Sequence, residues 1–442
     1  MARSRISQQS LLRLFRRPTR TLAPINNRKV TSEKSLSVDA TPEQDQIFTQ
    51  QKQNEEVQQY TELVRDFLDP ADFYRSIRNI GIDFFCGIPD SLLKNFCAYV
   101  TAHADRRKHV ITANEGSAIA LAAGYHMATK KFAMVYLQNS GLGNCVNPLT
   151  SLTPPQVYGL PMLLLVGWRG EPGKRDEPQH MHKGYVTPGL LATVGIPFQV
   201  LPDYKEGAEQ ALYDAQQHME RSSSPYALLV RRQTFLSYKL PKGEDTYHLG
   251  REEAVQTVSS ILNDYDVVVA TTGMLSRELF EYRARNRQGH ERDFLTVGSM
   301  GHASTIALGI ALSKPSRQIW CLDGDGALIM HLGALATVGE TAPGNFKHIV
   351  INNESHDSVG GQPTAARHGT FDIPMAAKAC GYREAFTAVT RDEVLAGIDR
   401  LHSLPGPVLL EIKTNRGSRK DLGRPTRSPQ ENKHDFMKFL SQ

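Results

Sequence analysis

Apolar runs that alternate with helix-like segments limit most strongly what this chain can fold into. Residues 82–100, IDFFCGIPDSLLKNFCAYV, begin with an apolar run, continue through a loop and end in a helix-like pattern. Residues 109–129 and 132–152 repeat the same order. Strands joined by helices are typical of a mostly parallel sheet that helices cover on both faces. The chain is therefore predicted to have an α/β fold, with ligands at the carboxyl ends of its strands.

The alternation of strand-like and helix-like segments is interrupted at residues 236–250, which divides the chain into two halves. The segment LSYKLPKGEDTYHLG contains Pro, Gly and charged residues. The strand–helix alternation resumes after this segment, for example in DVVVATTGMLSREL at 266–279. At 442 residues the chain is too long for one ordinary hydrophobic core. We therefore expect two α/β domains of similar size, at residues 61–235 and 251–442, joined by a linker at 236–250.

The net charge of +5 comes from the amino-terminal segment. Residues 1–32 contain seven Arg, one Lys and no acid, a charge of +8, so the remainder carries −3. An Arg-rich, acid-free composition is typical of a mitochondrial transit peptide, and a disordered basic tail is the alternative. We therefore expect a location in the mitochondrial matrix, with a cytoplasmic location as the alternative. Residues 33–60, rich in Gln, Glu, Ser and Thr, are expected to form a flexible lead-in.

Three other classes of protein are disfavoured by composition. The five cysteines are scattered and form no CxxC pair, which argues against a disulfide framework or a zinc site. Apolar runs of 18 or more residues are absent from the sequence, so we expect no membrane-spanning helix. The body of the chain is mildly acidic and lacks a nucleic-acid-binding motif, so nucleic acid is not an expected partner.

Oxygen-bearing side chains follow two successive apolar runs in the second half. Asp325 stands between Gly324 and Gly326 after one run, and Asn352 and Asn353 follow the next. Because adjacent parallel strands end at the same edge of a sheet, Asp325 and one asparagine can share a hard cation. Mg²⁺ binds oxygen ligands and takes several of them from phosphate and water. The helix that starts after Gly326 also offers free N–H groups to an anion. These strand ends are therefore predicted to hold a magnesium diphosphate.

The spacing of these residues resembles that of the thiamine diphosphate-dependent enzymes. The Gly-Asp-Gly triplet at 324–326 is separated from Asn352 by 25 residues, a length that this family's cofactor motif spans. The resemblance implies that Asp325, Asn353 and the backbone carbonyl of Ser355 ligate the metal. It also implies two cofactors, thiamine diphosphate and Mg²⁺.

Two further segments agree with this resemblance and add cofactor-binding positions. In TANEGSAIALAAGY, Glu115 matches the glutamate that hydrogen-bonds the aminopyrimidine ring and activates the cofactor. In VGSMGHA, Met300 matches the apolar residue that supports the bent cofactor. The implied fold is a pyrimidine-binding domain followed by a diphosphate-binding domain, both with the thiamine diphosphate-binding fold, and no middle domain. The remaining implied cofactor contacts are Gly273, Met274, Gly298, His302, Gly324, Gly326 and Ala327.

Within this family, residues 67–414 resemble the phosphonopyruvate decarboxylase branch, through segments such as GIPDSLL, QNSGLGNCVNPLTSL and VINNESHDSVGGQPT. The resemblance implies decarboxylation of 3-phosphonopyruvate to phosphonoacetaldehyde and CO₂ in phosphonate biosynthesis. Sulfopyruvate or another 2-oxo acid is the alternative substrate, and a non-catalytic regulatory partner with the same fold is an alternative of another class. The resemblance also implies a homodimer, or a higher homo-oligomer, with active sites at the subunit interface.

Candidate substrate contacts follow strands in the first half. An anionic 2-oxo acid calls for Arg, Lys, His and N–H donors, and the loop at 167–183 is rich in cationic residues. The Gly-rich loop QNSGLGN at 138–144 offers further N–H groups. Besides Glu115, His356 and Asp357 are expected to be catalytic, because they follow the metal ligands and could handle protons during product release. The predicted substrate contacts are Asp90, Ser91, Asn139, Ser140, Arg169, Arg175 and His180.

Overall fold

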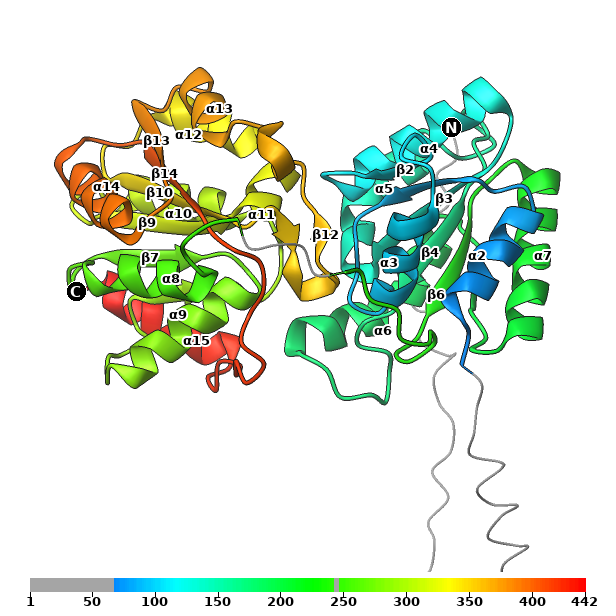
Figure 1. Cartoon of the computed structure of the whole chain (residues 1–442), viewed down its shortest axis with the longest axis horizontal. Helices are drawn as coiled ribbons and strands as arrows, with labels where there is room; N and C mark the ends of the chain where they lie inside the picture. The colour runs from blue at the N-terminus through cyan, green and yellow to red at the C-terminus, as the bar shows by residue number, and fades with distance from the viewer. Residues whose placement is uncertain (1–66, 242–245) are drawn as a thin grey trace, which may run out of the picture. The chain divides into compact units, whose positions relative to one another are not determined.

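The computed structural model describes residues 67–241 and 246–442. Two six-stranded sheets dominate these residues, and Figure 1 shows each sheet among its helices. The predicted transit peptide at 1–32 and the lead-in at 33–60 lie outside the described residues.

The first sheet has the strand order β2-β1-β3-β4-β6-β5, and all of its pairings are parallel. Its strands are β1 (Phe84–Gly87), β2 (His109–Ile111), β3 (Ala133–Gln138), β4 (Leu163–Gly167), β5 (Phe198–Val200) and β6 (Tyr226–Val230). One face packs on α2 (Pro70–Asn79), α3 (Lys94–His103) and α7 (Lys205–Ser222). The other face packs on α4 (Glu115–Thr129), α5 (Leu142–Ser151) and α6 (Pro178–Thr193).

The second sheet has the strand order β13-β14-β10-β9-β7-β8 and is also parallel throughout. Its strands are β7 (Val267–Ala270), β8 (Asp293–Leu295), β9 (Ile319–Gly324), β10 (Phe346–Asn352), β13 (Glu384–Ala388) and β14 (Val408–Lys413). One face packs on α8 (Arg251–Ser260), α9 (Met274–Arg285) and α14 (Arg391–Ser403). The other face packs on α10 (Ala303–Ser313), α11 (Asp325–Met330), α12 (Gly333–Thr341), α13 (Ile373–Ala379) and α15 (Pro429–Leu440). The predicted α/β class is therefore confirmed.

Burial explains why the central strands are apolar along their whole length rather than at alternate positions. Residues 163–166 of β4 have no exposed surface, and neither do residues 267–270 of β7. Because helices cover both faces, side chains that point either way are removed from water. Each fully buried Leu, Ile or Val stabilises the fold by roughly 1.5–3 kcal/mol relative to an exposed one.

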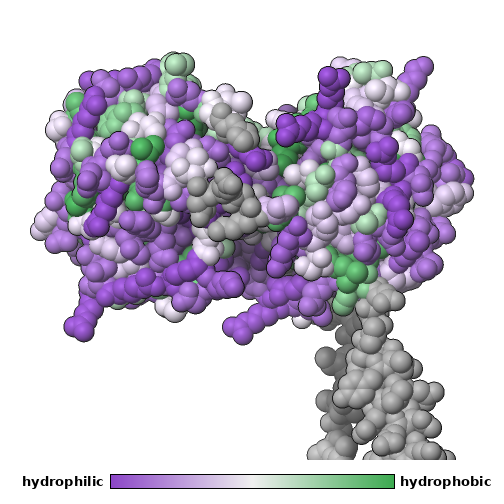
Figure 2. All heavy atoms as spheres, viewed as in Figure 1, coloured by the Kyte–Doolittle hydropathy of each residue, from purple (hydrophilic) through white to green (hydrophobic). Residues whose placement is uncertain are grey.

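The face of the molecule in Figure 2 is largely hydrophilic, and its hydrophobic residues lie in small, separate groups. Among the described helices, none has both the length and the apolar character needed to cross a membrane.

Candidate active site

The carboxyl ends of β9 and β10 bring the predicted metal ligands together. The two strands pair in parallel with Ile351 opposite Gly324, so the residues that follow lie side by side. Asp325, the first residue of α11, is 3% exposed, and Asn353 is 6% exposed. Ser355, whose carbonyl is the third predicted ligand, is also buried and begins the short strand β11 (Ser355–His356).

Asp325 is a buried carboxyl group held by a hydroxyl donor. Thr364 Oγ1 donates to Asp325 Oδ2 at 2.5 Å. Burial raises the pKa of Asp325 to about 7, against the lowering effect of the Thr364 hydrogen bond. A buried carboxylate is costly without a positive partner, so this group suits a site whose charge a cation balances. Carboxylate, amide and carbonyl oxygens are donors that fit Mg²⁺.

The two asparagines of the predicted motif differ in their surroundings. Asn352 Nδ2 donates to Glu411 Oε1 at 2.7 Å, and Asn352 Oδ1 accepts from the backbone N–H of Glu354 at 3.0 Å. Asn352 is therefore tied to the sheet. Asn353 Nδ2 donates to Asp357 Oδ2 at 2.8 Å, which leaves the amide oxygen of Asn353 as the one suited to a cation.

His356 lies against the glycine-rich turn. A Cβ atom at Gly326 would come within 3.1 Å of His356 Cε1 and 3.3 Å of Thr364 Cγ2, so glycine permits this close approach. Burial lowers the pKa of His356 to about 4, so its imidazole is neutral at pH 7. A neutral imidazole can accept a proton at one nitrogen and donate from the other.

A second group of potential metal ligands, Cys321, Asp323 and His348, is buried beneath the same strand ends. His348 Nε2 lies 3.6 Å from Asp323 Oδ2, and Asp323 Oδ1 accepts from the backbone N–H of Gly324 at 2.9 Å. Thiol and imidazole ligands do not suit Mg²⁺, so this group is distinct from the predicted magnesium site.

The loop at 297–302 lies against α11. Gly301 has a φ of +86°, and a Cβ atom there would be 2.8 Å from the carbonyl oxygen of Ala327. The His302 ring is exposed and its centroid is 4.2 Å from that of His331. Gly273, with a φ of +102°, is the N-cap residue of helix α9. The predicted cofactor contacts that are partly exposed, and so accessible to a ligand, are Gly273, Met274, Gly298, Met300, Gly324 and Gly326.

Glu115 forms a separate buried acid in the first sheet's domain. It is the first residue of α4, whose N-cap Asn114 accepts from the Gly116 N–H at 2.8 Å. Glu115 is 5% exposed, and its Oε2 accepts from Asn144 Nδ2 at 2.7 Å. A Cβ atom at Gly141 would lie 2.3 Å from Glu115 Oε1, so the loop after β3 can approach only because residue 141 is glycine.

Most of the predicted substrate contacts gather at the carboxyl ends of β1, β3 and β4. Arg169 Nη1 donates to Ser91 Oγ at 2.8 Å, and Asn139 Nδ2 donates to the Arg169 carbonyl oxygen at 2.9 Å. Ser140 follows directly, and its carbonyl oxygen accepts from Lys183 Nζ at 3.4 Å. Asn139 is 4% exposed, and its Nδ2 also donates to Thr187 Oγ1 at 2.9 Å.

The cationic residues at 167–183 lie in the loop after β4 and, from Pro178, in the first turns of α6. They differ in how freely they can bind an anion. Arg169 is paired with Asp176 through two hydrogen bonds of 2.9 and 2.6 Å. Arg175 is exposed and His180 is partly buried. Burial lowers the pKa of the His180 imidazole to about 4, so this ring is uncharged at pH 7.

Asp90 supports the chain before α3. Its carboxylate is fully buried and accepts from the backbone N–H groups of Leu92 at 2.8 Å and Leu93 at 3.3 Å. A Cβ atom at Gly167 would lie 2.0 Å from Asp90 Oδ2. These contacts favour a structural, turn-stabilising role for Asp90 over contact with an anionic substrate.

Several residues around these groups were not identified from the sequence. Thr364 and Asn144 lie in segments that carried the resemblance, GGQPT and QNSGLGN, so their motifs were a usable signal. Asp176 lies in the segment at 167–183 that was singled out for its cations, but its pairing with Arg169 is seen only in the fold. Arg251 and Glu278 gave no such signal, because their partners are fixed only by folding. Arg251, for example, pairs with Asp357, which is 106 positions away.

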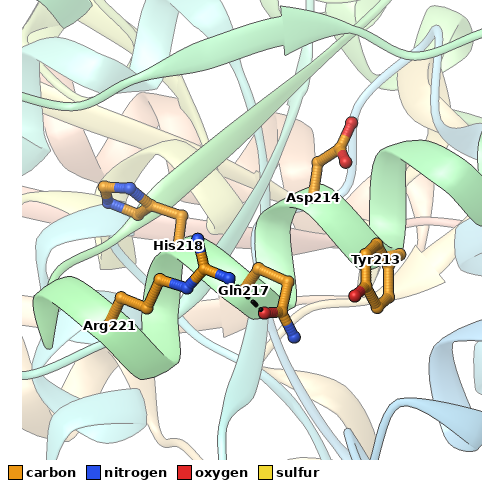
Figure 3. A pocket seen from close by; sticks show the side chains of 5 residues that line it. All are labelled: Tyr213, Asp214, Gln217, His218 and Arg221. Atoms are coloured by element: carbon orange, nitrogen blue, oxygen red, sulfur yellow. Dashed lines mark hydrogen bonds between the residues drawn. The ribbon is translucent and has the colours of Figure 1, made fainter.

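A shallow depression elsewhere in the described residues is unrelated to these groups. Figure 3 shows its lining side chains, all on α7, with Arg221 hydrogen-bonded to Gln217. These residues are Tyr213, Asp214, Gln217, His218 and Arg221. Because a single helix supplies them all, the depression is a feature of one helix surface.

Both halves of the chain match domains of known enzymes. Residues 71–186 match the family "Thiamine pyrophosphate enzyme, N-terminal TPP binding domain", and residues 271–412 match "Thiamine pyrophosphate enzyme, C-terminal TPP binding domain". The chain therefore belongs to the thiamine pyrophosphate enzymes, as the spacing of Asp325 and Asn353 indicated.

Within this family the chain is similar to phosphonopyruvate decarboxylases. It is 34% identical to the phosphonopyruvate decarboxylase of Streptomyces viridochromogenes, over 84% of this chain and 94% of that protein. It is 33% identical to that of Streptomyces hygroscopicus, over 85% of this chain and 94% of that protein. The sulfopyruvate decarboxylase of Methanosarcina acetivorans is 26% identical over 74% of this chain and 86% of that protein.

The prediction of a mitochondrial matrix location is wrong. The Streptomyces relatives match over most of the chain and are bacterial proteins, and bacteria have no mitochondria. The prediction rested on the Arg-rich, acid-free composition of residues 1–32. That composition is not specific to transit peptides, because basic tails of other kinds share it.

Proposed function

We propose that this chain catalyses the thiamine diphosphate- and magnesium-dependent decarboxylation of 3-phosphonopyruvate to phosphonoacetaldehyde and CO₂. The observation that carries the proposal is its identity of 34% to a phosphonopyruvate decarboxylase over 94% of that protein. The presence of Glu115, Asp325 and Asn353 argues against the alternative of a non-catalytic partner, which would not need all three.

The second domain would hold the diphosphate end of the cofactor through Mg²⁺. Asp325 would supply a carboxylate oxygen, Asn353 an amide oxygen and Ser355 its backbone carbonyl oxygen. Support comes from the convergence of two of these buried side chains at paired strand ends. The cation would keep Asp325 ionised, offsetting the burial that raises the pKa of this group.

Glu115 would control the proton at the ring nitrogen of the cofactor's aminopyrimidine. Its Oε2 is held by Asn144 at 2.7 Å, so its other oxygen can face the ring in a fixed orientation. The bound cofactor supplies an electron sink for the electrons released when CO₂ departs. His356, neutral and close to the glycine-rich turn, is proposed to exchange protons during product release.

The substrate's two anionic groups would be bound by residues of the first domain. Arg169, Ser91 and Ser140 lie around the carboxyl ends of three strands. Arg175 is in the loop after β4, and His180 is in the first turn of α6. Because the Arg169 guanidinium already pairs with Asp176, it would bind the substrate only through the donors that Asp176 leaves available.

The active enzyme is proposed to be a homodimer or a higher homo-oligomer. The family resemblance implies that Glu115 of one subunit faces Asp325 of another. An isolated subunit would then lack a complete site.

Turnover of 3-phosphonopyruvate, sulfopyruvate and pyruvate by the purified protein with thiamine diphosphate and Mg²⁺ tests the proposal. We expect the highest kcat/KM with 3-phosphonopyruvate. The sulfopyruvate decarboxylase of Methanosarcina acetivorans, 26% identical, motivates the second candidate substrate. A higher kcat/KM with sulfopyruvate would favour that alternative, and no CO₂ from any of the three would contradict both.

A further inference from the structure

We propose that Asp357 and Arg251 are positioning residues that hold the Asn353 amide oxygen toward the metal. The inference rests on the proposed magnesium site and assigns Asp357 a role different from proton transfer. It concerns three side chains of one domain, supplied by α8 and the segment that follows β10.

Asp357 is surrounded by donors. Its Oδ2 accepts from Asn353 Nδ2 at 2.8 Å, from Arg251 Nη1 at 2.7 Å and from the backbone N–H of Gly417 at 2.9 Å. Its side chain is 10% exposed. An oxygen that already accepts three hydrogen bonds has little capacity left for a further donor, so Asp357 Oδ2 is committed to these three partners.

This arrangement decides which end of the Asn353 amide faces the metal. The two ends of an amide are similar in size, so its orientation depends on its hydrogen-bond partners. Because Asp357 Oδ2 accepts from Arg251 and Gly417, it presents an acceptor to Asn353 and therefore requires the Nδ2 end of that amide. The Oδ1 end then points away from Asp357, where it accepts from the Ser355 N–H at 3.2 Å and retains a lone pair for a cation.

Arg251 fixes Asp357 in turn. Its guanidinium donates to Glu278 at 3.0 Å from Nε and 2.8 Å from Nη2, while Nη1 reaches Asp357. The side chains of Arg251 and Glu278 are 7% and 1% exposed. Arg251 therefore places one buried cation between two carboxylates, which keeps Asp357 from adding an unbalanced negative charge near Asp325.

The test measures how Mg²⁺ concentration controls thiamine diphosphate binding, by calorimetry, in the full-length protein and the D357N variant. D357N is nearly isosteric but replaces the carboxylate by a neutral amide, a weaker acceptor whose Nδ2 can also turn toward Asn353, so the orientation of the Asn353 amide is held less strongly. We expect the apparent Mg²⁺ affinity to fall by about 10- to 100-fold, as for other residues that orient metal ligands. Saturating Mg²⁺ should restore most of kcat.

The exchange variant N353D/D357N separates positioning from proton transfer. It keeps the summed charge of the pair and allows a hydrogen bond between the two swapped groups, and a carboxylate at position 353 presents an oxygen to the metal in either orientation. We expect its Mg²⁺ affinity to return to within about 10-fold of wild type, well above that of D357N. The exchange variant carries the test alone if D357N does not fold. D399N is the matched control, because it makes the same chemical change at an exposed aspartate on α14.

Two results would overturn the inference. One is an unchanged Mg²⁺ affinity in D357N, and a loss of kcat at saturating Mg²⁺ alongside it would assign Asp357 to proton transfer. The other concerns the exchange variant. If D357N folds, an exchange variant with no higher Mg²⁺ affinity than D357N contradicts the inference. If D357N does not fold, an exchange variant that does not bind Mg²⁺ contradicts it. Failure of the proposed function is a different result, because the wild-type protein would then bind neither Mg²⁺ nor thiamine diphosphate.

Discussion

At the scale of single residues, Glu115 is the acid proposed to control the proton on the cofactor's aminopyrimidine ring, and no other residue is proposed for this role. Replacing it by glutamine (E115Q) keeps its size and its contact with Asn144 but removes the ionisable proton site. We expect thiamine diphosphate affinity to stay within about threefold, while kcat falls by at least about 100-fold, the range for loss of a general acid–base group. Steady-state kinetics and calorimetry measure the two effects.

The matched control for this prediction is E220Q, on the exposed surface of α7. It makes the same Glu-to-Gln change, but away from the carboxyl ends of the strands where the candidate site residues lie. Near-normal turnover by E115Q would contradict the assigned role of Glu115.

Asp325 gives a pH-dependent prediction for the metal-free protein. Its pKa is raised from 3.8 to about 7 by burial, so the folded state binds a proton that the unfolded state releases near pH 4. This contribution to stability is complete below pH 4 and is lost as the pH rises toward 7, by up to about 4 kcal/mol. D325N should therefore remove part of the decline in stability between pH 4 and pH 7.

Thermal and urea unfolding in the presence of a chelator measure this effect. The control is D399N, an exposed position on α14. Equal pH profiles for wild type and D325N would show that Asp325 does not titrate in this range. Because Mg²⁺ needs the ionised carboxylate, its affinity should rise with pH through the same range in the wild-type protein.

At the scale of elements, the loop between β3 and α5 controls the position of Glu115. G141A places a methyl group where Glu115 Oε1 lies 2.3 Å away, so the carboxylate must move. We expect a loss of about 1–3 kcal/mol in stability and a fall in kcat. Gly143, close by in α5, is the matched control, because a Cβ atom added there would have nothing within 4 Å.

G143A should leave kcat unchanged and stabilise α5 by up to about 1 kcal/mol, since alanine favours the helix. Thermal unfolding and kcat of both variants are compared. If G141A matches G143A in kcat, the close approach of this loop does not determine the orientation of Glu115.

The two sheets were predictable from sequence because parallel strands buried on both faces are continuous apolar runs. The proposed magnesium site was predictable for a related reason. Polar residues that directly follow parallel strands lie at the same edge of the sheet. Asp90 shows the limit of this reasoning. It also follows a strand, but its carboxylate is turned toward its own backbone at Leu92, which depends on the local turn.

The orientation of side chains within the site required the folded structure. The sequence pattern places Asn352 and Asn353 together but does not show that Glu411 ties down the first of them. Arg251 lies outside every motif, and its bond to Asp357 joins segments 106 positions apart. Such pairings depend on how helices pack against the sheet, which periodicity alone does not encode.

At the scale of the whole molecule, the proposed interface between subunits predicts complementation between two inactive variants. E115Q lacks the acid of the first domain, and D325A lacks the metal ligand of the second. If each site combines the two domains of different subunits, a mixed dimer has one site with both defects and one with neither. Random reassortment of equal amounts gives about half mixed dimers, and so about a quarter of wild-type activity.

The measurement is turnover after the two variants are mixed, dissociated and reassociated, beside each variant treated alone. The mixture should exceed both separate variants, and its activity should rise with the extent of subunit exchange. A site formed within one chain would instead keep every subunit defective, because each carries one lesion. A mixture no more active than its components, despite exchange seen by mass spectrometry, would therefore place Glu115 and Asp325 of one chain in the same site.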